Sequence, residues 1–167
     1  MKTVVLIGMM GSGKSTVGKL LTEKLSIKFF DIDTEIEKEN HKTISEIFSQ
    51  NGETYFRKIE KNLTQQFLKN NYLNAIISTG GGAFENKETR NFLLKNATVI
   101  YLKTSSNEIF ERIKTNTSRP LLKNNMTIEK ITEILENREA NYKQAHHTIS
   151  TDKKTPTEII SEILGVL

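Results

Sequence analysis

The residues with the clearest chemistry form one contiguous run from Gly8 to Ser15, with the sequence GMMGSGKS. This run fits the pattern G-x-x-x-x-G-K-[ST], the P-loop that cradles phosphate groups. Its glycines let the backbone turn tightly and bring N–H groups close to phosphate oxygens, and the helix that follows points its positive end at the same anion. Lys14 is then expected to reach the β- and γ-phosphates of a nucleotide, and the hydroxyl of Ser15 to bind Mg²⁺.

Two other interpretations of this run exist, a glycine-rich turn that binds nothing and a dinucleotide-binding loop. The dinucleotide pattern G-x-G-x-x-G would need a glycine at position 16 after Gly11 and Gly13, but that residue is Thr16. The apolar run at 4–7 predicts a buried strand, and apolar residues recur at helical spacing after Lys14. Because strand, loop and helix follow one another in the order that a P-loop requires, the sequence favours phosphate binding.

Two aspartates follow the second predicted strand. Asp31 and Asp33 come at the end of a strand predicted over 27–30, where alternation would point their side chains to opposite sides. One carboxylate would then face the metal at the P-loop and the other a second ligand, whereas the alternative is a turn pair that caps the next helix. Ligands of open α/β sheets bind at the carboxyl ends of the strands, so this position favours a function.

Three consecutive glycines, Gly80 to Gly82, follow a strand predicted over 75–78. Glycine permits close approach of a ligand to the backbone and leaves N–H groups available as donors. The alternative is a strand-to-helix turn that needs a positive φ, but one glycine would serve that purpose. The run of three therefore favours a ligand contact.

Arg138 and Arg57 are candidates for binding an anionic substrate. Arg138 lies on the apolar face of a helix predicted over 128–142, and a guanidinium that faces inward must be paired. A structural carboxylate and a substrate anion stay equally open as its partner. Arg57 lies at the edge of the buried stripe of its own helix, with Glu60 one turn later, and these residues alone favour an ordinary surface pair.

The segment from Thr115 to Asn125 is polar, contains Arg119 and interrupts the helical periodicity. A segment of this length without structure of its own is often an active-site lid. In a lid, Arg119 would close over the transferred phosphoryl group as a cationic clamp, and the alternative is a solvated loop arginine. The three histidines, at 41, 146 and 147, have no spacing typical of a metal site and are assigned structural roles.

The segments that must position these residues alternate between strand and helix. Such alternation predicts a five-stranded parallel sheet covered by helices on both faces, a three-layer α/β/α fold in one domain over residues 1–167. Strands are predicted over 4–7, 27–30, 75–78, 98–102 and 147–150. Helices are predicted from residue 14, over 34–39, 45–50, 53–70, 87–95 and 128–142, around Ile109, Phe110 and Ile113, and from Pro156.

Composition narrows the classes of function. Of the 167 residues, 36% are hydrophobic and 26% charged, the balance of a soluble globular protein. The absence of cysteine excludes disulfides and thiolate chemistry and suits a cytoplasmic protein. No apolar run approaches the roughly 20 residues of a membrane span, and the direct entry into a strand predicts no signal peptide. The net charge of +4 comes from scattered lysines with few aromatics nearby, which favours small anionic substrates over nucleic acid.

Several of these pieces occur together and in one order, and they resemble the shikimate kinase family over nearly the whole chain. The P-loop alone is shared by very many nucleotide-binding proteins, whereas the combination in a chain of this size is highly specific. The pieces are GMMGSGKST at 8–16, Asp31-Ile32-Asp33 with Ile36-Glu37, Gly52-Glu53 with Phe56-Arg57 and Glu60, STGGGA at 78–83, RPLL at 119–122, and Arg138 with Tyr142.

The resemblance implies a P-loop kinase fold and transfer of the γ-phosphoryl group of ATP to the 3-hydroxyl of shikimate, in chorismate and aromatic amino-acid biosynthesis. It implies an acceptor-binding region at about 32–61 and a lid at about 112–125. Two arginines suit the carboxylate of such a substrate, and Asp33 suits its hydroxyl groups and the proton of the attacking one. The implied partners are ATP and shikimate, without nucleic acid or membrane, for a monomer in the cytoplasm.

The resemblance also assigns roles residue by residue. The implied catalytic residues are Lys14, Asp33 and Arg119. Shikimate would be held by Asp33, Arg57, Gly80, Gly81, Gly82 and Arg138. ATP would be held by Gly11, Ser12, Gly13, Lys14, Ser15, Thr16, Arg112 and Arg119, and Mg²⁺ by Ser15 and Asp31. Where family members often place an arginine against the adenine, this chain has Lys153 and Lys154, and their contact with adenine is left open.

Two alternatives are set against this interpretation. Another P-loop kinase, for gluconate or a nucleoside monophosphate, would share the phosphate site, but a nucleotide acceptor would need a pocket that reads a base. A nucleotide-dependent switch or a nucleic-acid-binding protein would also share it, but the guanine-reading pattern N-K-x-D does not occur in the chain. An aspartate and two arginines suit a hydroxylated acid better than either alternative.

Overall fold

The structure is a computed structural model that describes residues 2–70, 74–115 and 127–167. At its centre lies a sheet of five parallel strands in the order β2-β3-β1-β4-β5. The strands are β1 (Val4–Ile7), β2 (Lys28–Asp31), β3 (Ala75–Ser78), β4 (Thr98–Lys103) and β5 (His147–Ser150). The predicted five-stranded parallel sheet is confirmed, and β1, β3 and β5 have the predicted bounds.

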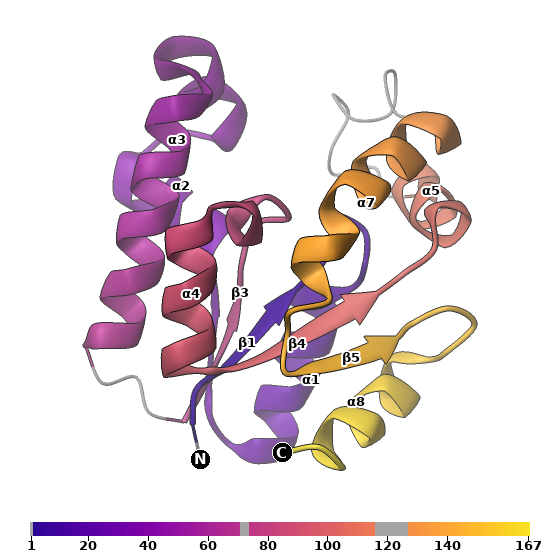
Figure 1. The fold of residues 1–167 in the computed structure, drawn as a ribbon. Helices are drawn as coiled ribbons and strands as arrows, with labels where there is room; N and C mark the ends of the chain where they lie inside the picture. The colour runs from indigo at the N-terminus through magenta and orange to yellow at the C-terminus, as the bar shows by residue number, and fades with distance from the viewer. Residues whose placement is uncertain (1, 71–73, 116–126) are drawn as a thin grey trace.

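Helices cover both faces of this sheet (Figure 1). Pro156 opens the last of them, as predicted, and Thr155 caps it through a hydrogen bond from the backbone N–H of Glu158. The helical segments are α1 (Lys14–Leu25), α2 (Ile32–Asn40), α3 (Ile44–Lys69), the 3₁₀ turn η1 (Ala83–Glu85), α4 (Lys87–Asn96), α5 (Ser106–Thr115), α7 (Ile128–Tyr142) and α8 (Pro156–Leu164).

Alternate residues of the strands point to opposite faces and build two cores. On one face Val5 and Tyr101 pack with buried side chains of α2, α3, α4 and α7. On the other face Leu6 and Ile100 pack with buried side chains of α1 and α8. Because both faces are covered, the strands are apolar on both sides, which is why they read as continuous apolar runs in the sequence.

The structure corrects the prediction for the start of α2 and confirms the predicted break within α3. α2 begins at Ile32, so Asp33 lies in the first turn of a helix. The prediction that Asp31 and Asp33 alternate along one strand is therefore wrong, because the strand ends at Asp31. In α3 the predicted break is confirmed, because the helices predicted over 45–50 and 53–70 meet at a bend at Gly52, whose φ of 79° and ψ of 171° are not helical. The bend falls where the sequence predicted a break.

The strand order indicates where a ligand would bind, at the carboxyl ends of the strands around β1. β1 lies between β3 and β4, so the order of the chain reverses at β1, and ligands of open α/β sheets bind at such a switch point. The P-loop follows β1 at this edge. Asp31 ends the neighbouring β2, and its register partner in β3 is Ser78, two residues before Gly80.

The predicted lid lies largely outside the described residues, and so does Arg119. Within the described ranges, no helix is both long enough and apolar enough to cross a membrane.

Candidate active site

The P-loop turns from β1 into α1 through backbone conformations that favour glycine. Gly8 has a φ of 144°, and a methyl group in place of its α-hydrogen would lie 2.7 Å from the carbonyl oxygen of Leu102. Gly13, the residue before α1, has a left-handed φ of 91°. Neither position accepts an ordinary side chain, so no side chain from Gly8 or Gly13 covers the backbone of the loop next to the first turn of α1. The unpaired N–H groups of such a turn bind anions.

Lys14 is the first residue of α1 and is 9% exposed. Its Nζ donates to the carbonyl oxygens of Gly8, at 2.9 Å, and Met9, at 3.0 Å. The ammonium group therefore lies against the loop, at the place where a bound phosphate would meet it. In the same loop, the hydroxyl of Ser12 is buried and has no hydrogen-bond partner in the part of the chain that the structure describes. A bound phosphate suits both groups.

Ser15 and Asp31 supply two oxygen atoms at the metal side of the P-loop. Ser15 Oγ donates to Asp31 Oδ2 at 2.6 Å. Asp31 makes no side-chain hydrogen bond to the start of α2, so the capping alternative does not describe it. No group of three or more His, Asp or Glu that could hold a metal occurs among residues 2–70, 74–115 and 127–167. Mg²⁺ usually takes one or two protein oxygens and completes its shell with phosphate and water, so this pair fits Mg²⁺ bound together with a nucleotide.

Arg57 and Glu60 form an ion pair on α3. Arg57 Nη1 donates to Glu60 Oε2 at 2.9 Å, and Arg57 Nη2 donates to Glu53 Oε1 at 3.1 Å. Glu60 is only 2% exposed, so this is not the ordinary surface pair that the residues alone favoured. Burial raises the pKa of Glu60, and the positive charge of Arg57 opposes that rise. The pair fixes the guanidinium of Arg57 at the end of the sheet.

Gly80 and Gly82 let acidic and basic side chains approach the same stretch of backbone. A methyl group on Gly80 would lie 2.4 Å from Glu60 Oε1 and 3.0 Å from Asp33 Oδ1. A methyl group on Gly82 would lie 2.7 Å from Arg57 Nη2. None of the three glycines has a positive φ, so a turn that needs one does not explain them. Gly80 and Gly82 leave room for side chains of α2 and α3 to pack directly against the backbone.

Gly81 is the point where α7 meets the P-loop. Arg138 Nη1 donates to the carbonyl oxygen of Gly81 at 3.1 Å, and the hydroxyl of Tyr142 donates to the same oxygen. A methyl group on Gly81 would lie 3.4 Å from the carbonyl oxygen of Gly8 and from the nitrogen of Met10. No carboxylate of the described residues forms an ion pair with Arg138, so a structural carboxylate is not the partner seen.

Arg112 lies beside the P-loop at the end of α5. Its Nη1 donates to the carbonyl oxygen of Gly11 at 3.4 Å, and its Nη2 donates to that of Thr151 at 3.0 Å. Its Nε donates to Glu108 Oε1 at 3.1 Å. A nucleotide on the P-loop would lie within its reach, and the contact with ATP stays a prediction.

The remaining residues considered from the sequence are Arg119, Lys153, Lys154 and the histidines. Arg119 is outside the described residues. Lys154 pairs with Glu162 Oε1 of α8 at 2.6 Å, and Lys153 has a left-handed φ of 57°. Nδ1 of His146 accepts a hydrogen bond from the backbone N–H of Val99 at 3.0 Å, in agreement with the structural role predicted for it.

Two residues of the site were not assigned from the sequence. Tyr142 is fully buried and bonds the carbonyl of Gly81, yet an aromatic residue on an apolar stripe reads as core. The sequence indicates Glu60 only as a partner for Arg57. Its position, four residues after Phe56 and three before Leu63, places a carboxylate on the buried stripe of α3. That is the signal which would have predicted its burial.

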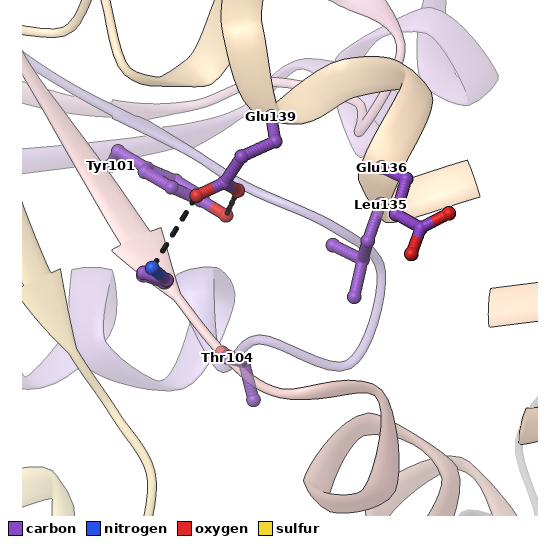
Figure 2. Close-up of a pocket in the computed structure, with 6 residues that line it drawn as sticks. Tyr101, Thr104, Leu135, Glu136 and Glu139 are labelled. Atoms are coloured by element: carbon purple, nitrogen blue, oxygen red, sulfur yellow. Dashed lines mark hydrogen bonds and ion pairs between the residues drawn. The ribbon is translucent and has the colours of Figure 1, made fainter. Parts of the chain in front are cut away.

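A separate hollow of about 190 Å³ lies between β4 and α7. Figure 2 shows the side chains that line it, with a hydrogen bond between Tyr101 and Glu139. The hydroxyl of Tyr101 donates to Glu139 Oε2 at 3.0 Å. Its lining residues are Tyr101, Lys103, Thr104, Leu135, Glu136 and Glu139. None of them is a predicted site residue, so this hollow is distinct from the candidate site.

The known proteins to which this chain was compared and which are named below share one family description. A family model described as shikimate kinase matches residues 10–167. The shikimate kinase of Persephonella marina is 48% identical over 165 residues, which cover 99% of this chain and 98% of that protein.

Two solved structures extend the likeness to the fold. The shikimate kinase from Acinetobacter baumannii, in complex with shikimate, matches with a TM-score of 0.91 at 33% identity, over 99% of this chain and 92% of that chain. The shikimate kinase from Aquifex aeolicus matches with a TM-score of 0.82 at 35% identity, over 98% of this chain and 94% of that chain. The likeness thus covers almost the full length, which the P-loop alone would not produce.

Proposed function

We propose that this chain, which belongs to the shikimate kinase family, holds ATP on its P-loop and shikimate between α3 and α7. The chain is an ATP-dependent kinase that transfers the γ-phosphoryl group to the 3-hydroxyl of shikimate, giving shikimate 3-phosphate and ADP. The reaction belongs to chorismate and aromatic amino-acid biosynthesis.

One observation carries the residue assignment. Asp33, Arg57 and Arg138 come from three helices, and all three lie against the glycines at 80–82. The middle glycine touches the P-loop in turn. An acceptor held by the three side chains would therefore lie next to the phosphates held by the loop, as direct transfer requires.

The two guanidinium groups suit the carboxylate of shikimate. Arg138 donates only to uncharged groups, the carbonyl of Gly81 and the sulfur of Met9, among the described residues. A substrate carboxylate offers it a charge-assisted hydrogen bond, which is stronger than the bond to a neutral carbonyl. Arg57 is held in place by Glu60, so little side-chain freedom is lost when it binds the substrate.

Asp33 suits the hydroxyl groups of the substrate, because an ionised carboxylate accepts hydrogen bonds. In the proposed reaction the 3-hydroxyl oxygen attacks the γ-phosphorus, and its proton passes to the carboxylate of Asp33. The bond between the γ-phosphorus and the β,γ-bridging oxygen breaks as the new one forms, and ADP leaves with that oxygen. Lys14 stabilises the charge that develops on the phosphoryl oxygens.

The nucleotide side is assigned to the P-loop and its neighbours. The phosphates are bound by Gly11, Ser12, Gly13, Lys14, Ser15 and Thr16, with Arg112 and Arg119 as further ATP contacts. Ser15 and Asp31 would hold Mg²⁺, which neutralises charge on the β- and γ-phosphates when it is bound. We also propose that the enzyme acts as a monomer in the cytoplasm; sedimentation at working concentration tests the first point, and fractionation of the source cell the second.

A substrate panel tests the proposal. ADP release would be coupled to a reporter reaction and measured with shikimate, gluconate and CMP as acceptors. We expect turnover with shikimate at least about a hundredfold above that with the other two, since a site built for particular polar groups rejects ligands that leave them unpaired. Turnover with CMP or gluconate alone would overturn the assignment of the acceptor side, which is formed by Asp33, Arg57, Arg138 and the glycines at 80–82.

A further inference from the structure

The turn from Gly80 to Glu85 carries the glycines of the acceptor side, and several helices hold it. From α7, Tyr142 donates to the carbonyl of Gly81, and Asn141 Nδ2 donates to Glu85 Oε2 at 3.0 Å. Within the turn the backbone hydrogen bonds are those of Ala83 to Gly80 and of Glu85 to Gly82, both at 3.1 Å. So few internal bonds leave the position of the turn dependent on the helices around it.

Arg90 is the attachment from α4. It is 9% exposed, and its Nη1 donates to the carbonyl oxygens of Phe84, at 2.8 Å, and Glu85, at 3.2 Å. Both carbonyls belong to η1, and the last carbonyls of a helical turn have no partner within it. A side chain of α4 thus reaches back to close the turn that precedes the helix.

The stability of the fold alone does not favour a buried arginine at position 90, in the first turn of α4. Arg90 is the fourth residue of α4, close to the end where the helix dipole is positive and repels a cation. In the described ranges Arg90 forms no ion pair, and its Nε is buried without a hydrogen-bond partner. Burying a guanidinium without a carboxylate is costly. No step of phosphoryl transfer uses this group, so its cost requires another explanation.

We propose that Arg90 is a positioning residue for the shikimate side of the site. By holding the carbonyls of Phe84 and Glu85, it fixes the distance between the glycines at 80–82 and the side chains of α2, α3 and α7 that face them. The inference rests on the proposed function, in which these groups contact shikimate. The phosphates are bound by a different segment, between β1 and α1, so a loosened turn weakens shikimate binding more than ATP binding.

Three variants test the inference. Arg90→Met keeps an unbranched side chain but removes the charge and the donors. Arg90→Lys keeps the charge and a donor for the carbonyls. Lys61→Met is the matched control, because Lys61 joins α3 to α4 through Glu88 at 2.6 Å, and within the described ranges no hydrogen bond or ion pair links it to the turn. KM for each substrate, kcat, the melting temperature, and calorimetric binding of shikimate without nucleotide would be measured for each variant.

For Arg90→Met we expect a KM for shikimate raised about tenfold with a KM for ATP within about twofold of wild type, because misplacing binding groups acts on the ligand they hold. Its melting temperature should stay near that of wild type, since removal of the buried charge offsets the loss of the hydrogen bonds to the two carbonyls. Arg90→Lys should lie between Arg90→Met and wild type, and Lys61→Met should match wild type in both KM values.

An unchanged KM for shikimate in Arg90→Met would overturn the inference, and so would an equal rise of both KM values. If Arg90→Met does not fold, Arg90→Lys decides: a rise of the shikimate KM alone supports the inference, and values equal to those of Lys61→Met overturn it. Calorimetry of wild type distinguishes a failure of the proposed function from a failure of the inference on Arg90 alone. Absence of shikimate binding by wild type would overturn the proposed function and this inference together, whereas normal binding by both wild type and Arg90→Met overturns the inference alone.

Discussion

The P-loop takes its residues from one run of the chain, whereas the acceptor side takes them from four separate segments. Lys14 is six residues from Gly8, whose carbonyl it bonds. Arg138 is 57 residues from Gly81, whose carbonyl it bonds. The first contact follows from local backbone geometry, and the second exists only after the sheet and α7 have come together.

This difference predicts different responses to substitution. A P-loop side chain acts on a ligand that the backbone of the loop already holds, so its loss should affect the reaction step more than the binding of the acceptor. An acceptor-side residue acts through its distance from residues on other helices, so its loss or displacement should affect the KM for shikimate.

The largest effect is expected for Lys14→Ala. Loss of its charge next to the transferred group should lower kcat by on the order of a hundredfold or more, with little change in nucleotide-free binding of shikimate. Steady-state kinetics and calorimetry measure the two quantities. Lys19→Ala removes an exposed lysine of the same helix and is the control. Turnover near the wild-type rate in Lys14→Ala would contradict the role given to this residue.

Arg138→Ala should act on the other side of the comparison. A hydrogen bond between charged groups is worth about 1.5–3 kcal/mol, so the KM for shikimate should rise roughly ten- to a hundredfold. The KM for ATP should stay within about threefold, because among the described residues Arg138 donates to the sulfur of Met9 and the carbonyl of Gly81 but to no backbone atom of the P-loop. Arg138→Lys tests geometry against charge, since lysine cannot offer the planar pair of donors. An equal loss for both substrates would count against a carboxylate-binding role.

Gly82→Ala tests the position of Arg57 alone, because the substitution removes no functional group from the site. The added methyl group would lie 2.7 Å from Arg57 Nη2, so the guanidinium must move. We expect the KM for shikimate to rise about tenfold and the KM for ATP to stay the same, as a displaced binding group predicts. Gly165→Ala is the control, since its methyl group would have no contact shorter than 3.4 Å. Identical kinetics for the two variants would mean that Arg57 does not need its present position.

The same comparison explains which features the sequence could predict. The bounds of β1, β3, β5 and α7 were predicted correctly, because each has a clear apolar pattern and a break at its ends. The sequence predicts Asp33 at the end of a strand, because nothing in the two residues after a short strand marks the start of a helix, whereas α2 begins at Ile32. The place of Glu60 between Phe56 and Leu63 indicates its burial, but its contact with Gly80 depends on a segment that follows β3, and no pattern within α3 contains that information.

The smallest effect is expected for the pH dependence of stability at Glu60. Burial raises the pKa of Glu60 above its ordinary value of 4.5, although Arg57 opposes the shift. The folded state therefore holds this proton more tightly than the unfolded chain does. The stabilisation from Glu60 is complete below the unfolded pKa and is lost as the pH rises through the folded one. The free energy of unfolding of wild type relative to Glu60→Gln should accordingly fall as the pH increases above about 4.5.

Urea unfolding from about pH 4 to about pH 8 measures this difference, because the glutamine variant cannot titrate at that position. Glu88→Gln is the control, since the side chain of Glu88 is 67% exposed and its pairing with Lys61 lies at the surface. A difference between wild type and Glu60→Gln that rises with pH would mean that Arg57 outweighs burial. The acceptor side would then be organised by the ion pair itself rather than by the packing of Gly80 against it.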